Sequence, residues 1–321
     1  MKSFIIRDGA RKIATLQTEQ GHTVDGPTPT WLPQIMSELV KETNGRLKAN
    51  LLLGSNVRAF VLNMSKPPFD NVRIRKAIFL GLDRQNIVDV ALTNEEFGAF
   101  GLAGTFFPPG PVESPEALFA ANAPGYRLNK AEDIAEAKAL LIDAGYSYGF
   151  KADLNYGNSV ATTLVAEALP EQLRRELRID FTLKPVDTAT YHAVLQSGDL
   201  EATISATAPL IFDPSDTFNQ SFSPNIEKNP DNWEDPKLSE LMALQEKEVD
   251  TDKRNAMFAE VAEILQKGES QWMPITWHEA GYIHDYRLQG FKMPMTIQMV
   301  HKDEALWWDP DAKCPVEGGC T

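Results

Sequence analysis

The alternation of apolar and polar residues between positions 150 and 207 predicts three strands separated by two helices. The strand pattern occurs three times, in "FKADLNYG" (150–157), "IDFTLKPV" (179–186) and "LEATISAT" (200–207). The segments between them, 159–178 and 187–198, have the helical period. Strand, helix, strand, helix, strand in succession builds a parallel sheet with right-handed crossovers. The pattern therefore predicts an α/β fold.

Periodicity also predicts helices outside this unit, together with one long strand. Residues 32–40 and 129–146 have the helical period, and Gly145 ends the second helix. The run "LKANLLLGSNVRAFVLN" (47–63) is apolar and strand-like, whereas 97–116 is dense in Pro and Gly and is interpreted as an irregular loop. We expect the middle of the chain to bury one core that includes Leu140, Leu154, Leu164, Phe181, Leu183 and Ile204.

Residues 66–92 predict two short helices joined by a tight turn, and the first helix carries Arg73, Arg75 and Lys76. Such a pair is typical of a DNA-binding helix-turn-helix, and also of an ordinary packed helix pair with a solvated face. Composition separates the two, because the chain has 31 Lys+Arg against 45 Asp+Glu and a formal net charge of −14. A field of that sign repels phosphate, and no other basic tract offsets it. We therefore expect no nucleic-acid partner.

The sequence gives no indication of a membrane span, a cofactor or a metal site. No run of eighteen apolar residues is present. The first residues, "MKSFIIRDGARK", lack the apolar core and the cleavage site of a signal peptide. Cys314 and Cys320 enclose five residues that include Pro and two Gly, which allows either a small disulfide loop or two free thiols. No histidine or further cysteine lies at ligand spacing, so we expect neither metal nor cofactor.

Two loops follow the predicted parallel strands at their carboxyl ends, where ligands of such sheets bind. These are residues 156–159 and 207–223. The second loop contains Asp213 and Asp216, which could serve as the paired carboxylates of a hydrolase-like enzyme. The "DPSD" sequence is more simply explained as a turn in which Pro214 sets the geometry and Asp216 caps a helix. No GxSxG, HExxH or P-loop pattern accompanies the two carboxylates, so we expect binding without catalysis.

Several segments, in order along the chain, resemble the extracellular solute-binding proteins of family 5, the peptide- and nickel-binding group that serves ABC importers. "LNMSKPPFDNVRIRKAIFLGLDRQNIVD" is similar to the signature of that group. Further similarity lies in "AEAKALLIDAGYSYGF", "EQLRRELRIDFTLKPVDTATYHAVLQSGDLEATIS", "DPSDTFNQSFS" and "DTDKRNAMFAEVAEILQKGESQWMPITW". Each segment alone is degenerate, but their order and spacing together are specific, and they extend from about Gly9 to Trp277.

The resemblance implies a periplasmic-binding-protein fold of type II, with one near-complete lobe built on a parallel-type sheet. Residues 1–62 would be the remnant of the first lobe, 63–277 the second α/β lobe, and 278–321 the return segment and C-terminal tail. Most of the first lobe and its export signal would lie outside this chain, as in a fragment or a truncated gene product. We therefore expect residues 51–62 to expose apolar surface.

The same resemblance implies a function. The protein would capture a peptide or peptide-like small solute in the periplasm, outside the cytoplasmic membrane, and deliver it to the permease subunits of an ABC importer. Two alternatives stay open, a hydrolase-like enzyme that uses Asp213 and Asp216 in the same cleft, and a truncated protein that no longer binds.

The expected ligand contacts come from the two loops and from the return strand. They are Tyr156, Asn158, Phe212, Asp213, Asp216, Phe218 and Trp277. Peptide-binding members of the family resemble one another in an acidic residue shortly before the "DP" of this loop, which holds the peptide ammonium. Residues 208–212 are all apolar here, and a buried ammonium without a counter-charge is disfavoured. We expect a modified peptide, an opine-like or sugar-like compound, or a larger ligand, rather than a free peptide held by its amine.

Overall fold

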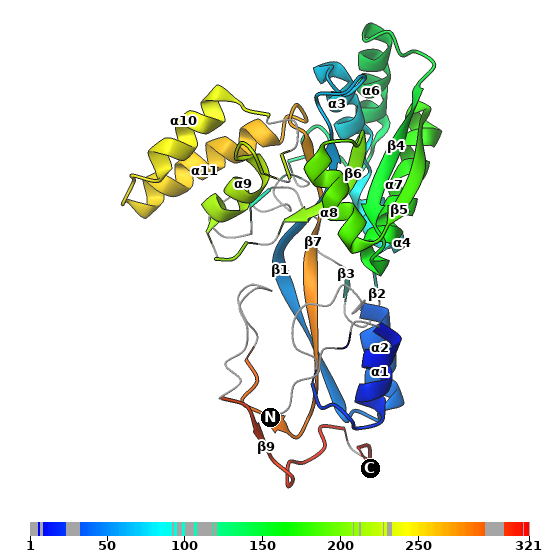
Figure 1. Ribbon diagram of the computed structural model, residues 1–321, viewed down its shortest axis with the longest axis vertical. Helices are drawn as coiled ribbons and strands as arrows, with labels where there is room; N and C mark the ends of the chain where they lie inside the picture. The colour runs from blue at the N-terminus through cyan, green and yellow to red at the C-terminus, as the bar shows by residue number, and fades with distance from the viewer. Residues whose placement is uncertain are drawn as a thin grey trace.

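The computed structural model gives the protein an upper α/β body from which two long paired strands descend to a small helical base (Figure 1). It describes residues 6, 9–23, 33–91, 93–94, 98–99, 106–107, 118, 121–207, 209–211, 213–226, 228–229, 233–292, 305–316 and 318–320.

The elements follow one another in mixed α and β order. The helices are α1 (Gly9–Gln17), α2 (Pro33–Glu42), α3 (Val72–Gly81), α4 (Arg84–Ala91), α6 (Ala131–Asp143), α7 (Val160–Leu177), α8 (Thr188–Ser197), α9 (Pro214–Phe222), α10 (Pro236–Gln245) and α11 (Thr251–Leu265). The strands are β1 (Leu47–Leu62), β2 (Thr93–Asn94), β3 (Gly98–Ala99), β4 (Phe150–Gly157), β5 (Ile179–Val186), β6 (Ala202–Thr207), β7 (Trp272–Asp285), β8 (Leu288–Gln289) and β9 (Trp307–Trp308).

The central sheet has the strand order β5-β4-β6-β1-β7. β4 pairs in parallel with both β5 and β6, as the sequence pattern predicts, with α7 and α8 as the crossovers. β1 runs antiparallel to β6 and to β7, so the whole sheet is mixed. The predicted strands 150–157 and 179–186 coincide with β4 and β5, and the α/β fold class is confirmed.

Both faces of the sheet are covered by helices, and each face buries its own apolar cluster. Phe60 and Leu62 of β1 point into the cluster that α3, α4, α6 and α7 cover, called the α7 cluster. The alternate residues Val57, Ala59 and Val61 point into the cluster of α9, α10 and α11, called the α11 cluster. The expectation of one core is therefore wrong, because a sheet with two covered faces buries two.

The six predicted core residues all belong to the α7 cluster or pack against it. Three are buried, namely Leu154, Phe181 and Ile204. The other three are half-buried against the same cluster, namely Leu140, Leu164 and Leu183.

The helix pair α3–α4 is a packed structural unit. Arg75 is buried and donates to the backbone carbonyls of Glu269 at 2.7 Å and Phe69 at 2.9 Å. Lys76 pairs with Glu136 at 3.5 Å on the surface. The solvated face of a packed helix pair thus includes Lys76 but not Arg75, because buried carbonyls supply the acceptors of Arg75.

β1 and β7 continue below the upper body and pack there against α1 and α2 (Figure 1). A small cluster is buried at this base, made of Leu16, Met36, Leu39, Leu47 and Ile283. Val57 and residues 59–62 are buried in the upper body. The expectation of exposed apolar surface is therefore wrong for those residues, and the side chains of 51–56 lie outside the described ones.

The C-terminal segment contains the disulfide that the sequence leaves open. Cys314 and Cys320 are bonded, with an S–S distance of 2.11 Å. In the described part of the chain, no helix is both long and apolar enough to cross a membrane.

Candidate functional site

The parallel strands β4, β5 and β6 end together at one edge of the sheet. The backbone N–H of Asn158, just beyond β4, donates to the carbonyl of Val186 at the end of β5 over 3.0 Å. The last residue of β6, Thr207, pairs with Val57, which on its other side pairs with Trp277 of β7. Asn158, Trp277 and the loop that follows β6 therefore lie along this carboxyl edge, where α/β sheets bind ligands.

Tyr156 and Asn158 are placed differently although they are two residues apart. Tyr156 is buried in the α7 cluster, and burial together with the charge of Glu167 raises the pKa of its hydroxyl. Asn158 is exposed at the end of the strand. Of the two residues, Asn158 is the one whose side chain is open to solvent. The ligand contacts of both residues stay predictions.

Asp213 is engaged in two structural roles. As the N-cap of α9 it accepts a hydrogen bond from the N–H of Ser215 at 2.9 Å. Its two carboxylate oxygens also accept from Arg254 of α11, at 2.7 and 2.9 Å. Burial alone would raise the pKa of Asp213, but the hydrogen bonds from Arg254 and Ser215 lower it to about 2.

Asp216 fixes the loop before α9. It accepts hydrogen bonds from the backbone N–H groups of Leu210 and Ile211 and, at 3.0 Å, from the side chain of Gln220. The prediction that Asp216 caps the helix is wrong, because Asp213 holds that position and Asp216 lies in the first turn.

The two carboxylates do not form an acid–base pair of the kind that hydrolases use. Such a pair needs one carboxyl group whose pKa is raised so that it holds a proton. The pKa of Asp213 is lowered instead, and Asp216 is occupied by N–H donors. Both carboxylates therefore have structural roles in the loop and in the start of α9.

Phe218 and Trp277 both belong to the α11 cluster. Phe218 packs against Phe222 with a ring distance of 5.1 Å. Trp277 is buried, and its indole N–H has no hydrogen-bond partner in the part of the chain that the structure describes. The remaining predicted contact, Phe212, lies outside the described residues.

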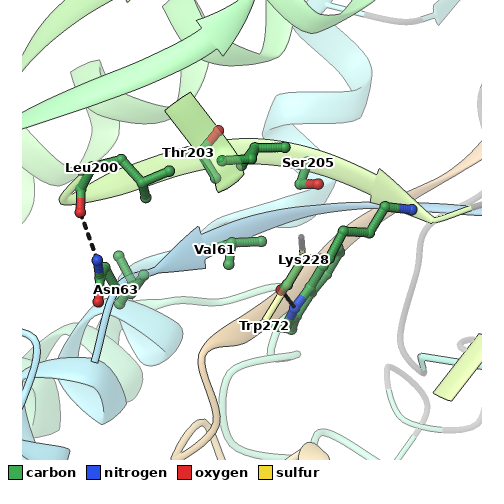
Figure 2. A pocket seen from close by; sticks show the side chains of 9 residues that line it. Val61, Asn63, Leu200, Thr203, Ser205, Lys228 and Trp272 are labelled. Carbon is green, nitrogen blue, oxygen red and sulfur yellow. Dashed lines mark hydrogen bonds between the residues drawn. The ribbon is translucent and has the colours of Figure 1, made fainter. Parts of the chain in front are cut away.

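A small cavity lies between β1, β6 and Trp272 (Figure 2). Its volume is about 10 Å³, which holds roughly one water molecule. Thr203 and Ser205 face it from β6, and Lys228 closes one side with its ammonium group 3.1 Å from Thr207. This cavity is far too small for a solute of peptide size.

Two arginines lie near the carboxyl edge and are absent from the predicted site residues, namely Arg254, which pairs with Asp213, and Arg58 of β1. Arg254 lies 41 positions from Asp213 in sequence, so no local pattern indicates the pair. Arg58 is a charged residue inside the apolar run of β1, which is a signal that sequence reasoning could have used. Among the described residues no group of His, Cys, Asp and Glu has the arrangement of a metal site.

Comparison with known proteins identifies related sequences. A family model described as bacterial extracellular solute-binding proteins, family 5, middle region, matches residues 3–229. A probable deoxycholate-binding periplasmic protein of Escherichia coli is 28% identical over 249 residues, 77% of this chain and 44% of that protein. An oligopeptide-binding protein of Bacillus subtilis is 27% identical over 257 residues, 76% of this chain and 44% of its own length.

Solved structures share the fold. The crystal structure of an oligopeptide-binding protein from Haemophilus influenzae in complex with a peptide matches with a TM-score of 0.78 and 22% identity, covering 95% of this chain and 57% of its own. A periplasmic binding protein of Helicobacter pylori in complex with the peptide STSA matches with a TM-score of 0.75 and 20% identity, covering 95% and 56%. The chain thus spans about half the length of these relatives.

Proposed function

The chain belongs to the bacterial extracellular solute-binding proteins of family 5, and we propose that it captures a peptide or peptide-like solute in the periplasm for an ABC importer. In this proposal the solute is delivered unchanged to the permease subunits. Relatives named as periplasmic oligopeptide-binding and ABC-transporter-associated proteins support it.

The observation that carries the proposal is the preorganised loop at the carboxyl edge of the sheet. Asp216 holds residues 210 and 211, and the ion pair of Asp213 with Arg254 ties the start of α9 to α11. A loop fixed from both ends keeps its geometry when a solute arrives, which lowers the entropy cost of binding. Both carboxylates are used for this support, so they add no catalytic group.

β1 and β7 supply the connection on which a two-lobe receptor closes. They are the strands that leave the upper body, and their pairing shifts register between Leu52 and Asn56, just below it. We infer that residues 1–62 are the remnant of the first lobe, 63–277 the second lobe and 278–321 the return segment. The hinge crossings in this proposal are 60–63 and 275–278, beside a second register shift between Arg58 and Ala59. Hinge closure around a ligand is a common switch in binding proteins of this architecture.

The ligand in this proposal is not held by an ammonium group on the loop before α9. The residues preceding Asp213 are apolar, and Asp213 is neutralised by Arg254. An N-blocked or modified peptide, an opine-like or sugar-like compound, or a larger apolar acid fits this environment. The deoxycholate-binding relative named above shows that proteins similar to this chain include one named for a non-peptide solute.

Calorimetry with a mixture of dipeptides and tripeptides tests the ligand class. We expect N-acetylated peptides to bind within about threefold of the free peptides, because no carboxylate of the described loop is available for the amine. Micromolar binding that vanishes when the amine is acetylated would contradict this part of the proposal. If acetylated and free peptides, bile acids and sugars all fail to bind, the receptor function itself is wrong.

A further inference from the structure

Arg58 occupies a central position at the carboxyl edge of the sheet. It lies on β1 between Ala206 of β6 and Thr276 of β7. The pairing of β1 with β6 ends at the adjacent residue, Val57. Its exposed fraction is 4%. An arginine in the middle strand of a mixed sheet is unusual, because a charge is costly to remove from water unless it is paired.

Arg58 differs from the other buried arginines because no hydrogen bond or ion pair joins its guanidinium to a described residue. Arg46 pairs with Asp285 at 3.0 Å, whereas Arg75 and Arg84 donate to backbone carbonyls. The Nη1 atom of Arg58 is buried without a hydrogen bond, and no described carboxylate lies within salt-bridge distance of its guanidinium. Burial lowers the pKa of Arg58 to about 10, with an opposing contribution from Tyr191.

The strand pair is irregular beside this residue. Arg58 pairs with Thr276 and Ala59 with Pro274, so β7 contains one extra residue, Ile275, at this point. Such bulges are frequent next to functional sites, where they redirect side chains. The irregularity and the unpartnered guanidinium therefore coincide at the edge where the solute is expected.

We propose that Arg58 anchors a carboxylate of the bound solute. This inference rests on the proposed function and names the chemical group that the site selects. A guanidinium has only donors, so its partner must be an acceptor, and its planar fork matches a carboxylate in bidentate geometry. A protein with a net charge of −14 repels anions at long range, so an acidic solute requires a local cation of this kind.

Binding of matched acid and amide probes tests the inference. The probes are N-acetyl-trialanine with a free C-terminal carboxylate and the same peptide as its C-terminal amide, titrated into the 321-residue chain by calorimetry. We expect the acid to bind on the order of 10- to 100-fold more tightly than the amide, the effect of a charge-assisted hydrogen bond in a desolvated site. In Arg58→Gln the two probes should bind alike, at the affinity of the amide.

Arg73→Gln is the matched control, because Arg73 is exposed on α3 and the substitution is chemically the same. It should leave the preference for the acid unchanged. Equal binding of acid and amide to the unmodified chain, or a preference that survives in Arg58→Gln, overturns the inference while leaving the proposed function intact. Failure of both probes to bind overturns the inference, and the proposed function stands or falls separately with the wider solute set above.

Thermal stability separates this role from a structural one. If Arg58 supported the fold, Arg58→Gln would lower the melting temperature, as loss of a paired buried arginine does. Because the guanidinium is unpaired, we expect the melting temperature of the ligand-free variant to be unchanged or higher. A fall of more than a few degrees, with acid and amide still distinguished, would show that Arg58 is a structural residue.

Discussion

Replacing Arg84 with alanine is expected to lower the free energy of unfolding by about 3–5 kcal/mol. Arg84 is buried, and it donates from Nε to the carbonyl of Pro274 at 2.6 Å and from Nη1 to that of Gly125 at 2.8 Å. Its guanidinium also lies 4.5 Å from the ring centre of Phe79 and 4.7 Å from that of Tyr126. Alanine would remove the guanidinium donor from both carbonyls, leaving that of Gly125 with Lys130 Nζ at 3.2 Å, and would open a void between the rings.

Urea denaturation of the variant measures this effect, with Arg73→Ala as the control from the neighbouring helix. Arg73 is exposed, so its loss should change the free energy of unfolding by no more than about 0.5 kcal/mol. Arg84→Lys should fall between the two, because an ammonium group lacks the fork that reaches both carbonyls. A loss below about 1 kcal/mol for Arg84→Ala would show that the joint between α4, the 125 turn and β7 is not stabilised in this way.

Asp213→Ala is expected to lower the free energy of unfolding by about 2 kcal/mol, from loss of the α9 cap and of the ion pair with Arg254. Asp213→Asn keeps an oxygen that can cap the helix, so it should cost about half as much. Chemical denaturation at neutral pH compares the two variants. Equal losses for alanine and asparagine would mean that the cap contributes nothing.

The pH dependence of the same variants tests the ion pair. Despite burial, hydrogen bonds from Arg254 and Ser215 lower the pKa of Asp213 to about 2 in the folded protein, from the ordinary 3.8 of an aspartate. A lowered carboxyl pKa stabilises the fold above the unfolded value and loses that effect as the pH falls through the folded value. The advantage of the unmodified chain over Asp213→Asn should therefore be constant from pH 7 to about 5 and shrink by on the order of 1 kcal/mol by about pH 3. An advantage that grows on acidification would contradict this.

The local pattern of apolar and polar residues was sufficient to predict the parallel strands of the sheet. β4 and β5 occupy the predicted residues because alternating strands bounded by helices with clear caps leave little freedom in their limits. The single predicted core failed because β1 contributes alternate residues to two clusters, and a run such as "VRAFVL" does not reveal that both faces are covered.

The candidate site was harder to predict, because its determinants are non-local. The "DPSD" sequence predicts a turn with Asp216 as the helix cap, whereas the helix begins at Pro214 with Asp213 as its cap. The partner of Asp213, Arg254, comes from a helix 41 residues away. Arg58 lacks an ion pair because no described carboxylate folds next to its guanidinium. A sequence pattern cannot show which carboxylates will lie near a given arginine. The position of Tyr156 near the end of a strand predicts a ligand contact, whereas the alternation of side chains along the strand turns its ring into the core.

The central claim is that this chain is part of a solute receptor that binds an acidic small molecule without changing it. Native mass spectrometry of the chain purified from its own host tests this most directly. We expect a non-covalent adduct of a single small acid, which is released unaltered on denaturation and is lost from Arg58→Gln but kept by Arg73→Gln. An adduct that lacks an acidic group, a released molecule that the protein has cleaved, or a chain that carries no adduct at all would contradict the account.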